Sequence, residues 1–291
     1  MDLTKTVNFN HILIIDLLSD DDFQTARRLD DNLSAFIPAH QRTHIKIHSK
    51  EKLLEVLEQI KLKEIPKGMR PIIHIEGHGS EQLLFLPDDS SITWAELYET
   101  LKDINILLNN KLILFIATCH GFHYINTLNL LKSTPTFFLI SPSKIIDPVT
   151  IEIGASIFYA SLFKTKDIDI SVKKLTTYNP FFESYNSDQF FINLMVNYFN
   201  DGHYGKPARE RVERLLSESF VIDESEGAII SRFERRVILS KRRKLAKSFI
   251  RSENSKFDIY KRHSLKFLGN YDKKIFYIII KEIELGLKKQ K

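Results

Sequence analysis

Short runs of apolar residues recur along the first half of the chain, and segments with helical spacing of apolar residues separate them. These runs are too short for buried helices and are rich in Ile, Leu and Phe, which is typical of strands inside a sheet. They predict five strands, at His11–Asp16, His44–His48, Pro71–Glu76, Lys111–Cys119 and Thr136–Ser141.

The segments between these strands predict helices. The helical segments are Phe23–Ile37, Glu51–Ile65, residues 93–108, a short one near Tyr124–Leu131, and Pro148–Phe163. Thr93 is followed three residues later by Glu96, so we expect a capping box at the start of the third helix. Gln82–Ile92 predicts a small hairpin around its Pro-Asp-Asp turn.

Strands that alternate with helices predict an α/β domain with a mostly parallel sheet and helices on both faces. We place this domain at residues 1–165 and expect residues 166–291 to form a mainly helical region. In that region, residues 176–188 (TTYNPFFESYNSD) predict a loop or docking segment, and Gln189–Phe199 predicts an aromatic-rich helix. Its apolar content needs burial, so we expect it to dock on the α/β domain. Phe276–Lys281 stays open between helix and strand.

Composition narrows the setting of the protein. The chain has 291 residues, a net charge of +5 and a single cysteine, so an internal disulfide is excluded and a reducing compartment is favoured. The polar start MDLTKTVNFN does not resemble a signal peptide. No apolar run approaches the roughly 20 residues that a membrane helix needs. We therefore expect a cytoplasmic protein without a membrane partner.

Three ionisable residues occupy alternate positions at the end of the third predicted strand: His74, Glu76 and His78. In an open parallel sheet, the functional crevice lies beyond the carboxyl ends of the strands. His78 lies just past the third strand and Cys119 ends the fourth, so the two residues share one rim if these strands are neighbours. An imidazole beside a thiol can take its proton and produce the nucleophilic thiolate.

Gly79 adds a second component to this hypothesis. A residue without a side chain leaves the backbone N–H after His78 sterically free. Together with the N–H of Cys119, this group would suit the oxyanion of a tetrahedral intermediate. Two roles stay open for His74 and Glu76. Either residue can orient the imidazole of His78 through a hydrogen bond, but a structural role is the one we favour.

The motifs at this rim resemble a known family. HIEGHGS, the acidic hairpin after it and the later LILFIATCHG are similar to the His-Gly and strand-Cys signatures of the caspase-like cysteine peptidases of clan CD, with the CHAT group closest. Cys119 follows His78 by 41 residues, near the ~50 of caspases. The later TFFLISPSKIIDPVTIEIGASIFYASLF is similar to the family's next strand, loop and helix. The resemblance covers roughly residues 10–165. Residues 117–121 (ATCHG) replace the caspase motif Q-A-C-[RQG]-G, so aspartate specificity does not follow.

The resemblance implies a caspase-like α/β fold and a protease that cleaves one or a few protein targets, often in bacterial defence or cell death. The expected partner is a protein substrate encoded nearby, and the need for an activator protein stays open. No metal or organic cofactor is expected. The resemblance places a substrate pocket in Ser141–Thr150, where Asp147 would suit a basic side chain and Lys144 an acidic one. The sequence does not choose between them.

Two alternatives compete with the protease. A lone cysteine at the end of an apolar strand is most often a buried apolar side chain, and the chain would then be a caspase-like interaction module that cleaves nothing. The presence of both His78 and Cys119 favours the enzyme. Zinc on His74, Glu76 and His78 is geometrically possible, but no other ligand spacing accompanies these residues. A chain with one cysteine also lacks the Pro-Cys-x-x-Cys of zinc deaminases.

A basic run occupies residues 231–251 (SRFERRVILSKRRKLAKSFIR). Its basic part, Arg232–Lys247, would suit an acidic partner or nucleic acid. The interpretation we favour is an ordinary solvated helix face. Under that interpretation five apolar residues turn inward: Phe233, Val237, Ile238, Leu245 and Phe249.

Overall fold

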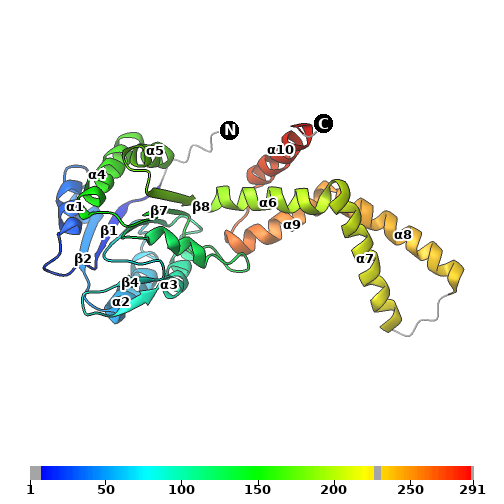
Figure 1. The fold of residues 1–291 in the computed structure, drawn as a ribbon, viewed down its shortest axis with the longest axis horizontal. Coiled ribbons are helices and arrows are strands. Elements are labelled where there is room, and N and C mark those ends of the chain that lie inside the picture. Colours follow the sequence, from blue (N-terminus) through cyan, green and yellow to red (C-terminus); the bar gives the residue numbers. More distant parts are fainter. Residues whose placement is uncertain (1–7, 226–230, 290–291) are drawn as a thin grey trace. The chain divides into compact units, whose positions relative to one another are not determined.

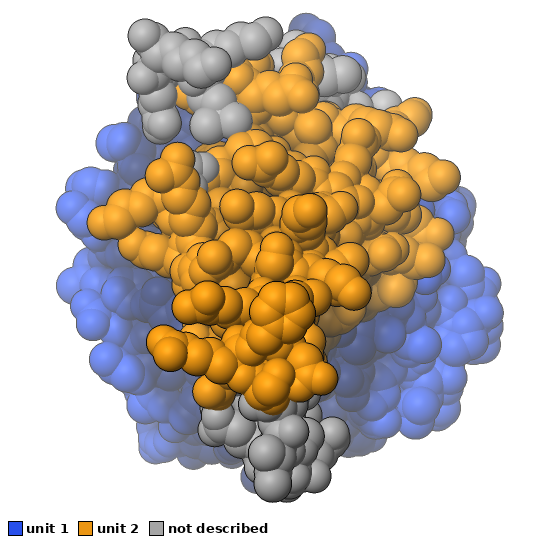
Figure 2. All heavy atoms as spheres, turned by 90° about the vertical axis from the view of Figure 1, so that its right-hand side faces the viewer, with its two compact units in different colours: residues 1–187, 267–269 blue, residues 188–266, 270–291 orange. Residues whose placement is uncertain are grey.

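The structure is a computed structural model that describes residues 8–225 and 231–289. The chain divides into two units, which Figure 2 shows in different colours. The first unit ends at Ser187 and also contains residues 267–269. The second unit begins at Asp188 and contains the other residues that follow.

A six-stranded sheet forms the centre of the first unit (Figure 1). Its strands are β1 (His11–Asp16), β2 (Arg42–Lys46), β3 (Pro71–Glu76), β6 (Ile113–Ala117), β7 (Phe138–Pro142) and β8 (Phe182–Asn186). Their order is β2-β1-β3-β6-β7-β8, and every neighbouring pair is parallel except β7 and β8. The mostly parallel α/β sheet predicted from the alternation of elements is thus confirmed.

Helices cover both faces of this sheet (Figure 1). They are α1 (Thr25–Leu33), α2 (Lys50–Gln59), α3 (Trp94–Leu107), α4 (Pro148–Thr165) and α5 (Ile168–Tyr178). α1, α4 and α5 share one face, where alternate strand residues such as Ile14, Ile72 and Phe115 pack against Phe158 in one apolar cluster. α2 and α3 lie on the opposite face.

The connection between β3 and α3 matches the local sequence signals. β4 (Leu83–Phe85) and β5 (Ser91–Thr93) form the antiparallel hairpin predicted for Gln82–Ile92. Thr93 then caps α3: its hydroxyl accepts the N–H of Glu96, and the Glu96 carboxylate accepts the N–H of Thr93. The predicted capping box is confirmed.

The first unit extends past the boundary expected near residue 166. α5 follows α4, and Phe182–Asn186 forms β8 rather than part of the predicted loop. β8 pairs antiparallel with β7, and its Phe182 and Tyr185 are buried. The loop prediction was wrong here, because Asn179-Pro180 and the polar residues around it resemble a turn region and hide an edge strand. The short helix expected near Tyr124–Leu131 is a 3-10 helix, η3 (Gly121–Thr127).

The second unit is helical, as expected for the C-terminal region. Its helices are α6 (Ser187–His203), α7 (Gly205–Ser225), α8 (Arg232–Arg251), α9 (Glu253–Phe267) and α10 (Lys273–Lys289). Phe276–Lys281, which the sequence left open, is helical within α10. Val212 and Leu216 of α7 pack with Ile250 of α8 in a small apolar cluster. Among the described residues, none of the helices combines the length and apolar content needed to cross a bilayer.

The basic run forms α8, but four of the five apolar residues expected to turn inward are exposed, and Ile238 is half-buried. Phe233 is 77% exposed and Leu245 is 70% exposed, and Val237 and Phe249 are also exposed. The prediction of an ordinary amphipathic helix with these four side chains in the core was therefore wrong. Binding of an acidic partner or nucleic acid through Arg232–Lys247 stays a prediction.

Candidate active site

β3 and β6 are adjacent and parallel, and Glu76 at the end of β3 pairs with Ala117 at the end of β6. His78 and Cys119 follow these two residues by two positions each, so the chain leaves both strands at the same rim of the sheet. Cys119 packs against the apolar cluster on the α1–α4–α5 face. The register therefore brings the predicted histidine and cysteine to equivalent positions at the carboxyl ends of neighbouring strands.

Gly79 allows the two strand exits to approach closely. A Cβ atom at position 79 would lie 2.7 Å from the carbonyl oxygen of Cys119 and 2.8 Å from Oγ1 of Thr118. Such a contact with backbone is too short for any side chain, so the position requires glycine. Among the described residues, no backbone carbonyl accepts the N–H of Gly79 or of Cys119, whereas the N–H of His120 donates to the carbonyl of Lys144 (3.3 Å). Free N–H groups at one rim are what an oxyanion hole needs.

The partner of the His78 imidazole is Asp22. Nε2 of His78 lies 3.0 Å from Oδ1 of Asp22, which belongs to the loop after β1. The N–H of Ser19 donates to Oδ2 of the same carboxylate (2.7 Å) and fixes it. Burial raises the pKa of Asp22, but the hydrogen bonds from Ser19 and His78 outweigh burial, so the pKa lies below its ordinary value. An ionised Asp22 on Nε2 leaves Nδ1 of His78 as the nitrogen that can accept a thiol proton.

Sequence reasoning missed Asp22. The signal was the acidic run Asp20–Asp22 in the loop that follows the first strand. β1 is the neighbour of β3, and Asp16 at the end of β1 pairs with Glu76. An acidic residue just past β1 therefore reaches the same rim as His78.

The thiol of Cys119 is partly buried and points to the next loop. Its Sγ donates to the carbonyl oxygen of Ile146 at 3.6 Å. In the described part of the chain, the thiol and the His78 imidazole are not hydrogen bonded to each other, since their partners are Ile146 and Asp22. Catalytic hydrogen bonds are often long or poorly aligned without substrate. The register pairs Glu76 with Ala117, so the two residues follow adjacent strands at one rim, and their side chains turn to different partners.

His74 and Glu76 belong to a buried network instead of orienting His78. Nε2 of His74 lies 2.9 Å from Oε1 of Glu76, and Nδ1 of His74 lies 3.1 Å from the hydroxyl of Tyr159. The hydroxyl of Thr25 donates to the other oxygen of Glu76. His74 and Glu76 are almost fully buried. Burial, and then the charge of Glu76, raise the pKa of Tyr159 well above its ordinary value, so the phenol keeps its proton. In the described structure the hydrogen-bond partner of the His78 imidazole is Asp22 and not His74 or Glu76.

The loop after β7 lies against the cysteine, because Ile146 accepts the thiol and Lys144 accepts the N–H of His120. Asp147 caps α4: its Oδ1 accepts the N–H of Thr150 at 2.9 Å. Hydrogen bonds from the hydroxyl and then the N–H of Thr150 lower the pKa of Asp147. Lys144 is exposed, and its Nζ lies 4.9 Å from the ring centre of Phe181. Both expected pocket residues thus lie near the rim. Asp147 is hydrogen bonded to Thr150, and Lys144 lies over the ring of Phe181.

No protein-family model matches this chain, and no curated protein matches it in sequence. What the rim can do must therefore be inferred from its residues, their geometry and the motif resemblance.

Three possible metal ligands also lie beside Cys119. The ligand atoms of Glu81, His120 and His123 all lie within 4.8 Å of one another. His120 adopts a left-handed backbone conformation (φ 57°), and Nδ1 of its ring is buried and has no hydrogen-bond partner in the part of the chain that the structure describes. Imidazole and carboxylate groups are common zinc ligands, so these three residues could hold a metal ion. The signal in the sequence was His-x-x-His at 120–123, which we did not consider.

Proposed function

We propose that this protein is a cysteine endopeptidase with His78 and Cys119 as its catalytic dyad. The observation that supports this most is the pairing of Glu76 with Ala117, which gives the histidine and the cysteine equivalent places beyond adjacent parallel strands. The mostly parallel sheet with helices on both faces agrees with the fold that the resemblance to caspase-like peptidases implies.

In the proposed reaction, Nδ1 of His78 takes the proton of the Cys119 thiol. The thiolate attacks the carbonyl carbon of a peptide bond, and the N–H groups of Gly79 and Cys119 hold the oxyanion. His78 then gives its proton to the leaving amine, so that a thioester on Cys119 remains. Water activated by His78 hydrolyses the thioester and restores the thiol.

Asp22 has a positioning role in this proposal. Its carboxylate holds Nε2 of His78 and so fixes the ring orientation and the tautomer that has its lone pair on Nδ1. The carboxylate also stabilises the imidazolium that forms when the thiol proton is transferred. This is the task that a third group performs in many nucleophile–base pairs.

The proposed substrate is a specific protein, and the motif resemblance suggests one encoded beside this chain, within a bacterial defence or cell-death system. The loop with Lys144 and Asp147 is the proposed wall of the substrate pocket, because its carbonyl groups bind the Cys119–His120 segment. Nucleic acid is not part of the proposed reaction.

A non-catalytic interaction module is the second candidate. The observation that favours it is the thiol of Cys119, which donates to Ile146 and packs against the apolar cluster like a structural cysteine. In such a module the rim would bind a partner protein, and neither His78 nor Cys119 would take part in chemistry.

Alkylation of the single cysteine separates the two candidates. We propose to measure the rate at which iodoacetamide alkylates Cys119 at pH 7 in the unsubstituted chain and in His78→Ala. The loss of a general base should slow alkylation by roughly 100-fold, the low end of the effect of such groups. The matched control is His40→Ala, an exposed histidine that precedes β2 at the opposite end of the sheet. A chelator is included, because Glu81, His120 and His123 could hold zinc beside the thiol.

Equal rates in the unsubstituted chain and in His78→Ala would contradict the dyad and favour the interaction module. If the rates differ as expected, the chain is then incubated with candidate proteins encoded beside it. Cleavage by the unsubstituted chain, mapped by mass spectrometry, should be absent with Cys119→Ala.

A further inference from the structure

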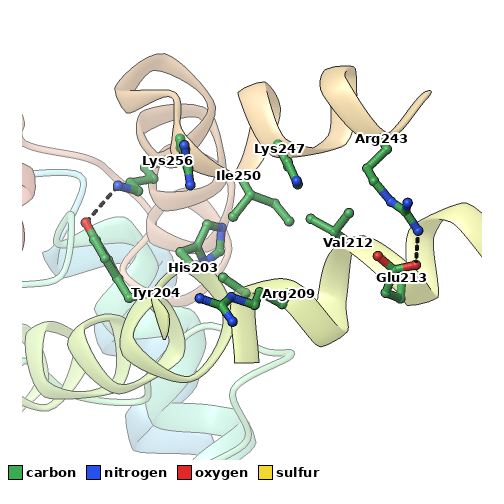
Figure 3. A pocket seen from close by; sticks show the side chains of 11 residues that line it. His203, Tyr204, Arg209, Val212, Glu213, Arg243, Lys247, Ile250 and Lys256 are labelled. Atoms are coloured by element: carbon green, nitrogen blue, oxygen red, sulfur yellow. Dashed lines mark hydrogen bonds and ion pairs between the residues drawn. The ribbon is translucent and has the colours of Figure 1, made fainter. Parts of the chain in front are cut away.

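A basic pocket lies within the second unit. Its residues are far in sequence from those of the candidate catalytic rim. It has a volume of about 810 Å³ and is lined by residues from the end of α6 and from α7, α8 and α9 (Figure 3). This volume is within the range of small-molecule sites. The cationic side chains of its wall are Arg209, Arg243, Lys247, Arg251 and Lys256. The acidic residue among them is Glu213.

Lys256 is buried, and its partner in the described structure is an uncharged tyrosine. Lys256 as a whole residue is 7% exposed. Nζ donates to the hydroxyl of Tyr204 at 2.7 Å and lies 4.5 Å from the centre of the same ring. Within the described residues, no carboxylate lies within ion-pair distance of this ammonium group. A buried charge without an ionic partner is costly, and an anionic ligand would supply that partner.

His203 has unused hydrogen-bonding capacity in the same pocket. It is 4% exposed, and neither ring nitrogen has a hydrogen-bond partner among residues 8–225 and 231–289. Burial, and then the charges of Arg211 and Lys256, lower the pKa of His203 to about 4. The imidazole is therefore neutral near pH 7 and has one N–H to donate. A buried donor without an acceptor costs free energy, and a ligand oxygen in the pocket would accept it.

The charges around the pocket do not balance. Arg243 is paired with Glu213 at 2.7 Å, as the dashed line in Figure 3 shows. Arg209, Lys247, Arg251 and Lys256 have no ion pair within the described part of the chain. Four unbalanced positive charges around one small cavity fit a ligand with several negative charges. Arg and Lys together are typical of phosphate sites, in which the guanidinium group binds two oxygens and the ammonium group acts as a point charge.

We propose that this pocket binds a small molecule with at least two phosphate groups. Lys256 and His203 contact one phosphate at the buried end, and the exposed Arg209, Lys247 and Arg251 bind the other at the mouth. Val212 and Ile250 provide an apolar wall for the organic part of the ligand. This site is independent of the proposed peptidase chemistry, and it involves the end of the basic run Arg232–Lys247 rather than the whole run.

Titration calorimetry of the full chain with tripolyphosphate at about 150 mM salt, where exposed charges are screened, tests the proposal. Binding of one equivalent is expected, and Lys247→Gln/Arg251→Gln should weaken it by at least about tenfold because two phosphate contacts are lost. The matched control is Lys241→Gln/Lys244→Gln, which removes the same charge from exposed residues of α8 that do not line the pocket. The control should bind within about twofold of the unsubstituted chain.

Lys256→Met gives an independent measure at the buried end. It should abolish tripolyphosphate binding and raise the melting temperature of the ligand-free protein, because a buried charge without an ionic partner is removed. A nucleoside triphosphate that binds more tightly than tripolyphosphate would show that the apolar wall contributes. Citrate, which has a similar charge but no phosphate, should bind more weakly. The proposal is overturned if tripolyphosphate does not bind, if both double variants weaken binding equally, or if only a long oligonucleotide binds.

Discussion

Nε2 of His78 lies 3.0 Å from Oδ1 of Asp22, although 56 positions separate the two residues in the sequence. The contact exists because β1 and β3 are adjacent parallel strands, so the loops after both strands meet at one rim. Asp22 is itself held by the N–H of Ser19, and its pKa is lowered. A fixed, ionised carboxylate is therefore already present on the imidazole before any substrate binds.

Asp22→Asn is expected to slow alkylation of Cys119 roughly 10- to 100-fold at pH 7, which is part of the effect of a general base. An amide can accept from Nε2–H, but it can also turn and donate to Nε2, which would fix the wrong tautomer, and it does not stabilise the imidazolium. The measurement is the second-order rate constant for iodoacetamide. Asp21→Asn removes a neighbouring carboxylate without this contact and should react at the unsubstituted rate. An unchanged rate in Asp22→Asn would exclude Asp22 as a positioning residue.

The central part of the fold could be predicted because its signals are local. The apolar runs at His11–Asp16 and Pro71–Glu76 match β1 and β3 residue for residue. The Thr93–Glu96 spacing marked the start of α3 correctly. β8 could not be predicted in this way: it is an edge strand with Glu183 and Ser184 exposed, and it becomes a strand because β7 offers a free edge.

The candidate site was partly predictable for the same reason. His78 and Cys119 lie at strand ends, and strand ends can be located from local patterns. Asp22 is recognised only once β1 is known to be the neighbour of β3, which is information about tertiary structure. The exposed apolar residues of α8, such as Phe233, show the reverse case, in which a helical pattern alone does not say which face is covered.

Gly79→Ala should distort the candidate active site. The new Cβ would lie 2.7 Å from the carbonyl oxygen of Cys119, and this backbone atom moves only if the rim moves. We expect the free energy of unfolding to fall by about 1 to 3 kcal/mol, typical of overpacking, and alkylation of Cys119 to slow. The matched control is Gly68→Ala, at a position where a Cβ would have open space and the strain comes from the positive φ of the turn alone. It should leave the alkylation rate unchanged. An unaltered rate in Gly79→Ala would contradict the role given to this close approach.

The buried network of His74 and Glu76 predicts a stability effect without an effect on chemistry. Tyr159→Phe removes the hydroxyl that lies 3.1 Å from Nδ1 of His74 and leaves a buried nitrogen without a partner. The free energy of unfolding, measured by urea denaturation, should fall by about 1 to 3 kcal/mol. Tyr124→Phe is the matched control, because the buried hydroxyl of Tyr124 has no hydrogen-bond partner in the described structure. That change should be neutral or stabilising.

The alkylation rate of Cys119 should be the same in Tyr159→Phe as in the unsubstituted chain. This follows because His78 is held by Asp22 and not by His74 or Glu76. If the rate falls by tenfold or more while the protein stays folded, the network of His74 and Glu76 does orient the imidazole of His78.

Asp16 predicts how stability depends on pH. Burial raises the pKa of this carboxyl, but hydrogen bonds from His44 and from the N–H of Leu18, and then the charge of Lys46, outweigh burial and lower it below its ordinary value of 3.8. A carboxyl whose pKa is lowered by folding stabilises the folded state at pH values above its ordinary pKa. That stabilisation is lost as the pH falls below about 4 toward the folded-state pKa. Asp16→Asn should therefore lower the free energy of unfolding at pH 7 by roughly 1 to 3 kcal/mol.

The difference between Asp16→Asn and the unsubstituted chain should shrink as the pH is lowered from 5 to 3, because the carboxyl is protonated first in the unfolded state and this favours unfolding of the unsubstituted chain. Urea denaturation at pH 7, 5, 4 and 3 measures this difference directly. Asp20→Asn provides the control. The Asp20 side chain is 90% exposed, and its ion pair with Lys46 is long, with Oδ1 of Asp20 at 3.6 Å from Nζ of Lys46. Exposed ion pairs contribute little, so this variant should follow the unsubstituted chain at every pH. A difference for Asp16→Asn that stays constant down to pH 3 would show that its effect comes from packing and not from the ionised carboxylate.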